Sequence, residues 1–151
     1  FYVIKKYLNI NYIYFFLADV GCGDGKYLNI NSKILSIGSD RSNALCRLAS
    51  LKYPPLPGSL TNQNQILICD NLNLPFRYWT ILYLKKLYMI NFFRNYLRSD
   101  LFDAVVSIGV IHHLSAEKRR IRAIQELARI LKPSGKIMIY VWAMEQRLRK
   151  V

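Results

Sequence analysis

An apolar run that ends in an acidic residue and three alternating glycines is the part of the chain best suited to chemistry. Its sequence is LADVGCGDG, with Asp19 near the end of the run and glycine at Gly21, Gly23 and Gly25. Glycine lacks a Cβ atom, so the backbone at these positions can approach a ligand closely and can adopt positive φ angles. The pattern is typical of a buried strand that leads into a tight ligand-binding turn.

Two nucleotide-like ligands suit such a turn, a dinucleotide and S-adenosylmethionine. The dinucleotide fingerprint G-x-G-x-x-G would place its third glycine where the sequence has Lys26. We therefore predict that the turn, including Cys22, binds S-adenosylmethionine. Asp19 would face the ammonium group of the methionine moiety. A turn with only a structural role is the alternative.

Five short apolar runs predict the strands of a parallel sheet. They comprise residues 14–20, 34–38, 66–69, 102–108 and 136–142. Because helical patterns alternate with these runs, we expect an α/β fold with a doubly wound parallel sheet, formed by residues 1–151 as one domain.

Two crossover helices are expected, one at 41–52 and one after Ser115, which we predict to be its N-cap. The apolar stripe of the second helix would comprise Ile121, Ile124, Leu127, Ala128 and Leu131. Its solvent-facing side would carry Lys118, Arg119, Arg122 and Arg129.

Polar residues follow the second and third predicted strands, where a doubly wound sheet binds its ligands. Asp40, beside Arg41, can accept hydrogen bonds from both ribose hydroxyls of the ligand. Asp70, Asn71 and Leu72 offer a carboxylate for the adenine amino group, a backbone N–H and an apolar wall. The structural alternatives are a helix cap for Asp40 and a turn role for Asp70.

The fourth predicted strand ends near Ile108, whose neighbourhood can present backbone carbonyl groups to the ammonium. The net charge of +13, from 22 basic and 9 acidic residues, favours a polyanionic partner. A solvated basic surface is the alternative.

The three cysteines and the absence of a long apolar run limit the class of protein further. Cys22, Cys46 and Cys69 lack the spacing of a disulfide framework or a zinc site, so we expect no metal and a reducing compartment, cytoplasmic or also nuclear. No run of about 18 apolar residues is present, so we expect no membrane span.

The motifs ADVGCGDGKYL, IGSDRS and CDNLNLPFR resemble those of the tRNA wobble-uridine (5-carboxymethyluridine) carboxyl methyltransferases. The stretch from FDAVVSIGVIHH to YVWAMEQ, residues 102–146, is similar as well. The resemblance covers roughly two-thirds of the chain. It implies a Rossmann-like class I fold that uses S-adenosylmethionine, with tRNA as the substrate and a small zinc-binding activator subunit as a partner.

The reaction that the resemblance implies is methyl transfer to the carboxylate of 5-carboxymethyluridine. This carboxylate is ionised at neutral pH, so the reaction needs no obligatory general base. His112 and His113 would contact the substrate, close the loop over the cofactor, or be buried and hydrogen-bonded. Trp142 would stack on a flipped base or pack under the sheet. Arg119, Arg120 and Arg122 would contact tRNA phosphates or form a solvated helix face.

Three departures from the family pattern stand beside the resemblance. Residues 1–16 and 78–100 are atypical, and we hypothesise that both are translated non-coding sequence. The strands that follow the fifth strand in the family are missing, so we expect a C-terminally truncated domain of about five strands. A catalytically silent regulatory paralogue and a small-molecule methyltransferase are the alternative functions.

Overall fold

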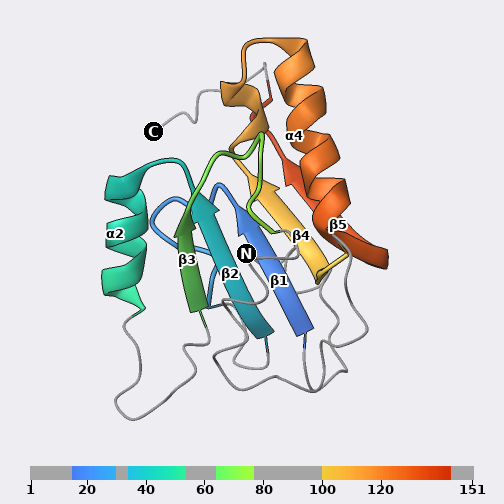
Figure 1. Ribbon diagram of the computed structural model, residues 1–151. Helices are drawn as coiled ribbons and strands as arrows, with labels where there is room; N and C mark the ends of the chain where they lie inside the picture. Colours follow the sequence, from blue (N-terminus) through green and yellow to red (C-terminus); the bar gives the residue numbers. More distant parts are fainter. Residues whose placement is uncertain (1–14, 30–33, 54–63, 77–99, 144–151) are drawn as a thin grey trace, which may run out of the picture.

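The structure is a computed structural model that describes residues 15–29, 34–53, 64–76 and 100–143. One sheet has five strands in the order β3-β2-β1-β4-β5, and every neighbouring pair is parallel (Figure 1). The strands are β1 Phe15–Val20, β2 Ile34–Asp40, β3 Asn64–Ile68, β4 Phe102–Ile108 and β5 Leu131–Tyr140. The chain builds outward from β1 to β3 and then continues on the other side of β1, so the strand order reverses between β1 and β4. This arrangement confirms the predicted fold class.

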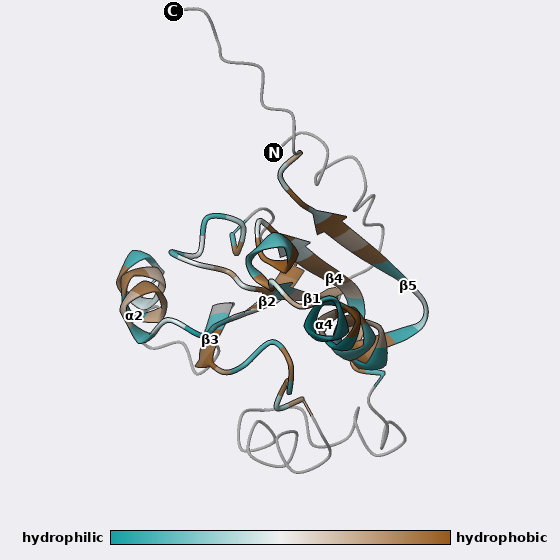
Figure 2. Cartoon of the chain, turned by 90° about the horizontal axis from the view of Figure 1, so that it is seen from above, coloured by the Kyte–Doolittle hydropathy of each residue, from teal (hydrophilic) through white to brown (hydrophobic). Residues whose placement is uncertain are grey.

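Helices lie on both faces of the sheet, which explains why its central strands are mainly apolar. Helix α4, Glu117–Ile130, lies on one face, and α2, Asn43–Lys52, lies on the opposite side of the sheet (Figure 2). Phe16, Ala18 and Val20 of β1 pack in the same cluster as the buried residues of α4. Leu17 belongs to a second cluster with side chains of β2 and β4.

Helix α4 begins and faces the sheet differently from the prediction. Its N-cap is Ala116, not Ser115, and the cap makes no side-chain hydrogen bond. Ile121 and Ile124, expected in the core, are 48% and 41% exposed. The buried face instead comprises Ala123, Glu126, Leu127 and Ile130. The helix is rotated because a paired carboxylate, Glu126, occupies part of the inward face.

The last strand also begins earlier than predicted. β5 starts at Leu131, directly after α4, and ends at Tyr140, so Trp142 lies beyond it. Its pairing with β4 shifts between Phe102↔Leu131 and Ala104↔Lys136, and the intervening turn holds Ser134 at a φ of 65°. β5 is one of the two edge strands of the described sheet, and β3 is the other.

Other boundaries agree within two residues. α2 begins at Asn43 because Ser42 is its N-cap, with Ser42 Oγ accepting a hydrogen bond from Leu45 N at 3.3 Å. Most of each atypical segment, 1–16 and 78–100, lies outside the described residues. Among the described helices, none has the length and hydropathy needed to cross a membrane.

Candidate functional site

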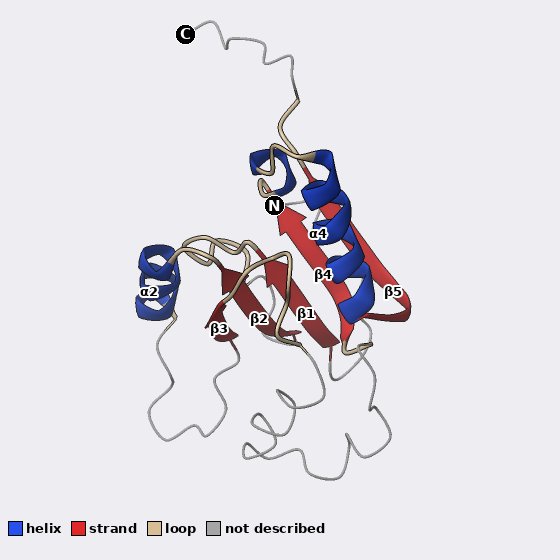
Figure 3. Ribbon diagram, turned by 45° about the horizontal axis from the view of Figure 1, so that its top comes forward, coloured by secondary structure: helices blue, strands red, loops and turns tan. Residues whose placement is uncertain are grey.

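The glycine turn after β1 is fixed to the end of β2 by its backbone. Gly21 N and Cys22 N both donate hydrogen bonds to Ser39 O, at 2.7 and 2.9 Å. Gly25 N then donates to Cys22 O at 2.9 Å, which closes the turn. The segments that follow the strands lie at the carboxyl end of the sheet (Figure 3), so the turn lies where parallel α/β sheets bind ligands.

The three glycines of the turn face different surroundings. A Cβ atom on Gly21 would collide with the side chain of Val110, and one on Gly25 would lie 3.1 Å from Ala49 Cβ. A Cβ atom on Gly23 would meet no atom within 4 Å, and Gly23 has a φ of 56°. Gly21 and Gly25 therefore serve close packing, and Gly23 is the glycine of the turn that faces open space.

Asp19 is a buried carboxylate that has no hydrogen-bond donor among the described residues. It is 1% exposed, and neither of its oxygens accepts a hydrogen bond within the part of the chain that the structure describes. Burial and, to a smaller degree, the charge of Asp40 raise the pKa of Asp19 to about 7. A buried acceptor group without a donor is rare in folded proteins. Such a carboxylate is suited to a cationic or hydrogen-bond-donating ligand.

The second carboxylate, Asp40, ends β2 and holds the turn. Its Oδ2 accepts a hydrogen bond from Gly23 N at 2.9 Å, and its Oδ1 accepts one from Ser42 N at 2.8 Å. Arg41 beside it is exposed. Cys22 is buried next to these carboxylates, and burial raises the pKa of its thiol, so Cys22 is uncharged at neutral pH and is not a nucleophile.

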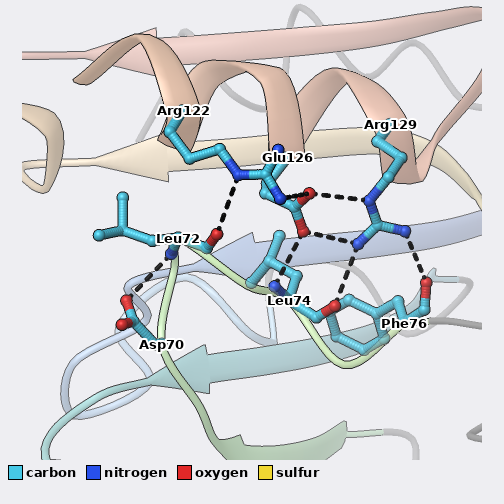
Figure 4. A network of polar contacts seen from close by, with 7 residues as sticks. All are labelled: Asp70, Leu72, Leu74, Phe76, Arg122, Glu126 and Arg129. Carbon is cyan, nitrogen blue, oxygen red and sulfur yellow. Dashed lines mark hydrogen bonds and ion pairs between the residues drawn. The ribbon is translucent and has the colours of Figure 1, made fainter. Parts of the chain in front are cut away.

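Asp70 lies in a turn that follows β3. Its Oδ1 accepts a hydrogen bond from Leu72 N at 3.0 Å (Figure 4). Its carbonyl oxygen accepts one from Asn73 N, also at 3.0 Å. Asp70 is exposed, while Asn71 and Leu72 are half-buried. The turn keeps these three residues at the end of the strand, as the sequence pattern predicts.

A short 3-10 helix, η1 Ile111–His113, follows β4 and brings a histidine against a tryptophan that lies just after β5. Ile108 is half-buried, and the next residue, Gly109, donates its N–H to Tyr140 O at 2.8 Å. His112 has both ring nitrogens buried without a partner among the described residues. Its ring stacks on Trp142, 5.3 Å between centroids, and tilts against His113 at 4.2 Å. Trp142 is 64% exposed, so it does not pack under the sheet.

The three arginines assigned to tRNA phosphates have different environments on α4. Arg119 is exposed, and its guanidinium makes no hydrogen bond or ion pair within the described ranges. Arg120 Nη1 donates to Leu114 O and Ser115 O, at 2.9 and 2.6 Å. Arg122 Nε donates to Leu72 O at 3.4 Å. Arg120 and Arg122 therefore also hold backbone segments.

Sequence reasoning missed Val110 and Glu126. Val110 fixes the place of Gly21, and Glu126 accepts a hydrogen bond from Leu74 N, close to the Asp70 turn. No sequence pattern identifies Val110 as a site residue, because apolar residues after strands occur in many structural settings. Glu126 carries a signal, since it is an acidic residue next to the apolar stripe of a basic helix.

Comparison with known proteins relates the chain to methyltransferases. A family described as "Methyltransferase domain" matches residues 87–139. "Probable tRNA methyltransferase 9B" of Mus musculus is 42% identical over 89% of this chain and 23% of its own length. "tRNA (carboxymethyluridine(34)-5-O)-methyltransferase" of Schizosaccharomyces pombe is 34% identical over 96% of this chain and 50% of its own. The chain thus spans half or less of these relatives.

Solved structures with a similar fold are more distant in sequence. The Pyrococcus horikoshii protein PH0226 superposes with a TM-score of 0.67 and 22% identity, over 94% of this chain and 51% of that protein. A TehB-like SAM-dependent methyltransferase of Corynebacterium glutamicum superposes with a TM-score of 0.58 and 18% sequence identity, over 85% of this chain and 58% of that protein. A methyltransferase in complex with the Haloferax volcanii Trm112 activator superposes with a TM-score of 0.55 and 22% sequence identity, over 81% of this chain and 42% of that protein. The sheet order and these structural neighbours show a Rossmann-like fold of the class I methyltransferase type, and in sequence the chain is similar to tRNA carboxymethyluridine methyltransferases and to tRNA methyltransferase 9B.

Proposed function

We propose that this chain binds S-adenosylmethionine and methylates the carboxylate of 5-carboxymethyluridine at the wobble position of tRNA. The observation that carries the proposal is the pair formed by Asp19 and Gly23. A buried carboxylate without a donor lies in the strand that leads to a turn whose middle glycine faces open space. A cationic amino-acid moiety beside a nucleoside satisfies both features.

The residues of the site fit the parts of this cofactor. Asp19 receives the ammonium group, which favours the ionised carboxylate and offsets the effect of its burial. Asp40 binds the ribose hydroxyls, because its two oxygens each accept only one hydrogen bond from the described residues. Asp70, Asn71 and Leu72 bind the adenine edge. Cys22, Arg41 and Ile108 line the same end of the sheet.

S-adenosylmethionine supplies an electrophilic methyl group bound to a sulfonium ion. The acceptor carboxylate has an ordinary pKa near 4 and is ionised at neutral pH, so no residue of the chain has to remove a proton. The task of the protein is to orient the two reactants and to exclude water. We assign His112, His113 and Trp142 to the acceptor side, where the half-exposed stack of His112 and Trp142 offers an aromatic surface to a base.

The names of the relatives support tRNA as the substrate, and the basic excess of the chain supports a polyanion. Arg119 would contact a phosphate directly, and Arg120 and Arg122 lie beside it on α4. We also propose an activator subunit, because one structural neighbour is complexed with the Trm112 activator. A cytoplasmic or nuclear location suits the three free cysteines.

Two measurements on the 151-residue chain test the proposal. Calorimetric titration with S-adenosylhomocysteine measures donor binding alone. Incubation with labelled S-adenosylmethionine and tRNA that carries 5-carboxymethyluridine, with and without a Trm112-type activator, measures transfer, and nucleoside mass spectrometry identifies the methyl ester. We expect both binding and transfer. Binding without transfer to tRNA would favour a silent paralogue or a small-molecule acceptor, and no binding would reject the cofactor assignment.

A further inference from the structure

The segment that follows β3 is held by side chains of α4 and not by a neighbouring strand (Figure 4). Three residues of the helix direct polar groups at its backbone. Arg122 Nε donates to Leu72 O at 3.4 Å, Glu126 Oε2 accepts from Leu74 N at 3.0 Å, and Arg129 Nη1 donates to Phe76 O at 3.0 Å. We refer to these three helix residues as the α4 clamp.

The spacing of the α4 clamp matches the spacing of the backbone that it holds. Helix residues at i, i+4 and i+7 lie on one face. In an extended segment, alternate residues present their groups in the same direction. Each residue of the α4 clamp therefore bonds one backbone position: Arg122 bonds Leu72, Glu126 bonds Leu74, and Arg129 bonds Phe76. The helix thus supplies hydrogen-bond partners that a neighbouring strand supplies elsewhere in the sheet.

Glu126 and Arg129 form the centre of the clamp. The Glu126 carboxylate is 2% exposed and accepts hydrogen bonds from Arg129 Nη2 at 2.7 Å and Arg129 Nε at 3.0 Å. The same Nη2 donates to Leu74 O at 3.0 Å. Leu74 is fully buried, so water cannot replace a partner that its backbone loses. A single ion pair thus satisfies both backbone groups of Leu74.

The clamp leads directly to the turn that carries Asp70. The carbonyl oxygen of Leu72 accepts the hydrogen bond from Arg122 Nε. The N–H of Leu72 donates to Asp70 Oδ1 at 3.0 Å. The place of the Asp70 carboxylate therefore depends on where α4 holds Leu72 and Leu74. The hydrogen bonds from α4 act together with the packing of Leu72 and Leu74 against the core.

We propose that Glu126 and Arg129 are positioning residues of the donor site, which set the place of the Asp70 turn and thereby the selectivity for the adenine amino group. The proposal rests on the proposed function, because it needs the Asp70 turn to face adenine. Neither side chain touches the ligand. Their effect is transmitted through Leu74, Leu72 and the backbone between them.

The test uses S-adenosylhomocysteine and its 6-deamino analogue, in which hydrogen replaces the exocyclic amino group. In the 151-residue chain we expect Glu126→Gln to weaken binding of S-adenosylhomocysteine about tenfold, since a buried acceptor is replaced by an amide that opposes Arg129. Binding of the analogue should change less than about threefold. The matched control is Glu117→Gln, the same substitution at an exposed position of the same helix, which should leave the preference for the amino group unchanged.

Hydrogen exchange provides a readout that does not depend on the ligand. The amides of Leu72, Asn73, Leu74 and Phe76 should exchange faster in Glu126→Gln, while those of β1 and β4 keep their protection. An unchanged preference for the amino group in a folded Glu126→Gln variant overturns the proposal. If that variant does not fold, Arg129→Lys decides, because it removes the guanidinium that donates to Leu74 O and Phe76 O and keeps a positive charge beside Glu126. An unchanged preference there overturns the proposal too. Loss of S-adenosylhomocysteine binding in the unsubstituted chain would instead reject the proposed function itself.

Discussion

The carboxylate of Asp40 holds the backbone of Gly23, with 2.9 Å between Asp40 Oδ2 and Gly23 N. The same carboxylate accepts a hydrogen bond from Ser42 N at 2.8 Å, next to the start of α2. Each oxygen still has a lone pair available for a ligand hydroxyl. A role at the start of the helix and a role in ribose binding are therefore compatible, and Asp40 can fix the shape of the turn before the ligand arrives.

The first prediction concerns Asp40→Ala. The substitution removes the restraint on Gly23 N and two charge-assisted hydrogen bonds to ribose, so S-adenosylhomocysteine affinity should fall about ten- to hundredfold in calorimetry. Asp24→Ala is the matched control, because Asp24 lies in the same turn and makes only an exposed ion pair with Lys52 at 3.4 Å. Equal affinities in both variants would contradict the role of Asp40.

The second prediction concerns the pH dependence of Asp19. Its folded-state pKa is about 7 and its ordinary value is 3.8, so the folded chain binds the proton more tightly than the unfolded chain. The contribution of Asp19 to stability is fully present below the ordinary pKa and is lost as pH rises through about 7. Without ligand, the free energy of unfolding should fall by about 2 kcal/mol more in the unsubstituted chain than in Asp19→Asn between pH 5 and 8. Denaturant unfolding at each pH measures this difference.

The ligand should reverse this trend. An ammonium group beside Asp19 favours the ionised carboxylate, so S-adenosylhomocysteine should bind with release of a proton below pH 7. Calorimetry in buffers of different ionisation enthalpy detects the proton. Identical pH profiles for the unsubstituted chain and Asp19→Asn would show that Asp19 does not titrate in this range.

The sequence predicted the sheet and the site at its carboxyl end because both depend on local patterns. The predicted strands are short, mainly apolar runs, so the acidic residues at or just after their carboxyl ends stand out. Asp19, Asp40 and Asp70 were found in this way, and the structure places each at the same end of the sheet.

The inward face of α4 was not predictable from the same patterns. Ile121 and Ile124 satisfy a helical period, yet the helix turns Glu126 towards the sheet because Leu74 N and Arg129 satisfy its carboxylate. Such a pairing joins residues 52 positions apart. Hydrophobic periodicity contains no information about a distant backbone amide that needs an acceptor.

The third prediction separates phosphate contact from structural support on α4. Arg119→Gln should weaken binding of all tRNAs alike and reduce the log-log salt slope by about 0.7 to 0.9, without a change in melting temperature. Arg120→Gln should also lower the melting temperature, because it removes the hydrogen bonds to Leu114 O and Ser115 O. Filter binding at several salt concentrations gives the slope. A slope that Arg119→Gln leaves unchanged would exclude a phosphate contact there.

The fourth prediction concerns the turn inside β5. Ser134 has a φ of 65°, a left-handed conformation in which a Cβ atom is unfavourable and glycine is not. Ser134→Gly should therefore raise the free energy of unfolding by about 0.5–1 kcal/mol. Gly135→Ala in the same turn should lower it, since the new Cβ atom would lie 2.7 Å from Leu131 Cδ1. Denaturant titration measures both, and a destabilised Ser134→Gly variant would contradict the assignment of strain.

The last prediction concerns the atypical segment between β3 and β4. The described residues on either side of it are held by neighbouring positions of α4: Phe76 O accepts from Arg129 Nη1 at 3.0 Å, and Leu101 N donates to Ile130 O at 2.9 Å. Both contacts come from the last two residues of α4, so the same end of one helix holds the described residues on either side of the segment.

Deletion of residues 78–98, which joins Arg77 to Ser99, should therefore leave the sheet and the donor site intact. Three residues then connect Phe76 to Leu101, and the shorter loop should raise the free energy of unfolding by roughly 1–2 kcal/mol through its smaller closure entropy. A variant with a Gly-Ser repeat of the original length in place of 78–98 is the control, because it removes the sequence and keeps the loop. We expect S-adenosylhomocysteine to bind the unsubstituted chain and both variants equally. An unfolded deletion variant would show that the segment is part of the domain, and retained donor binding with loss of transfer to tRNA in both variants would place it in the acceptor site.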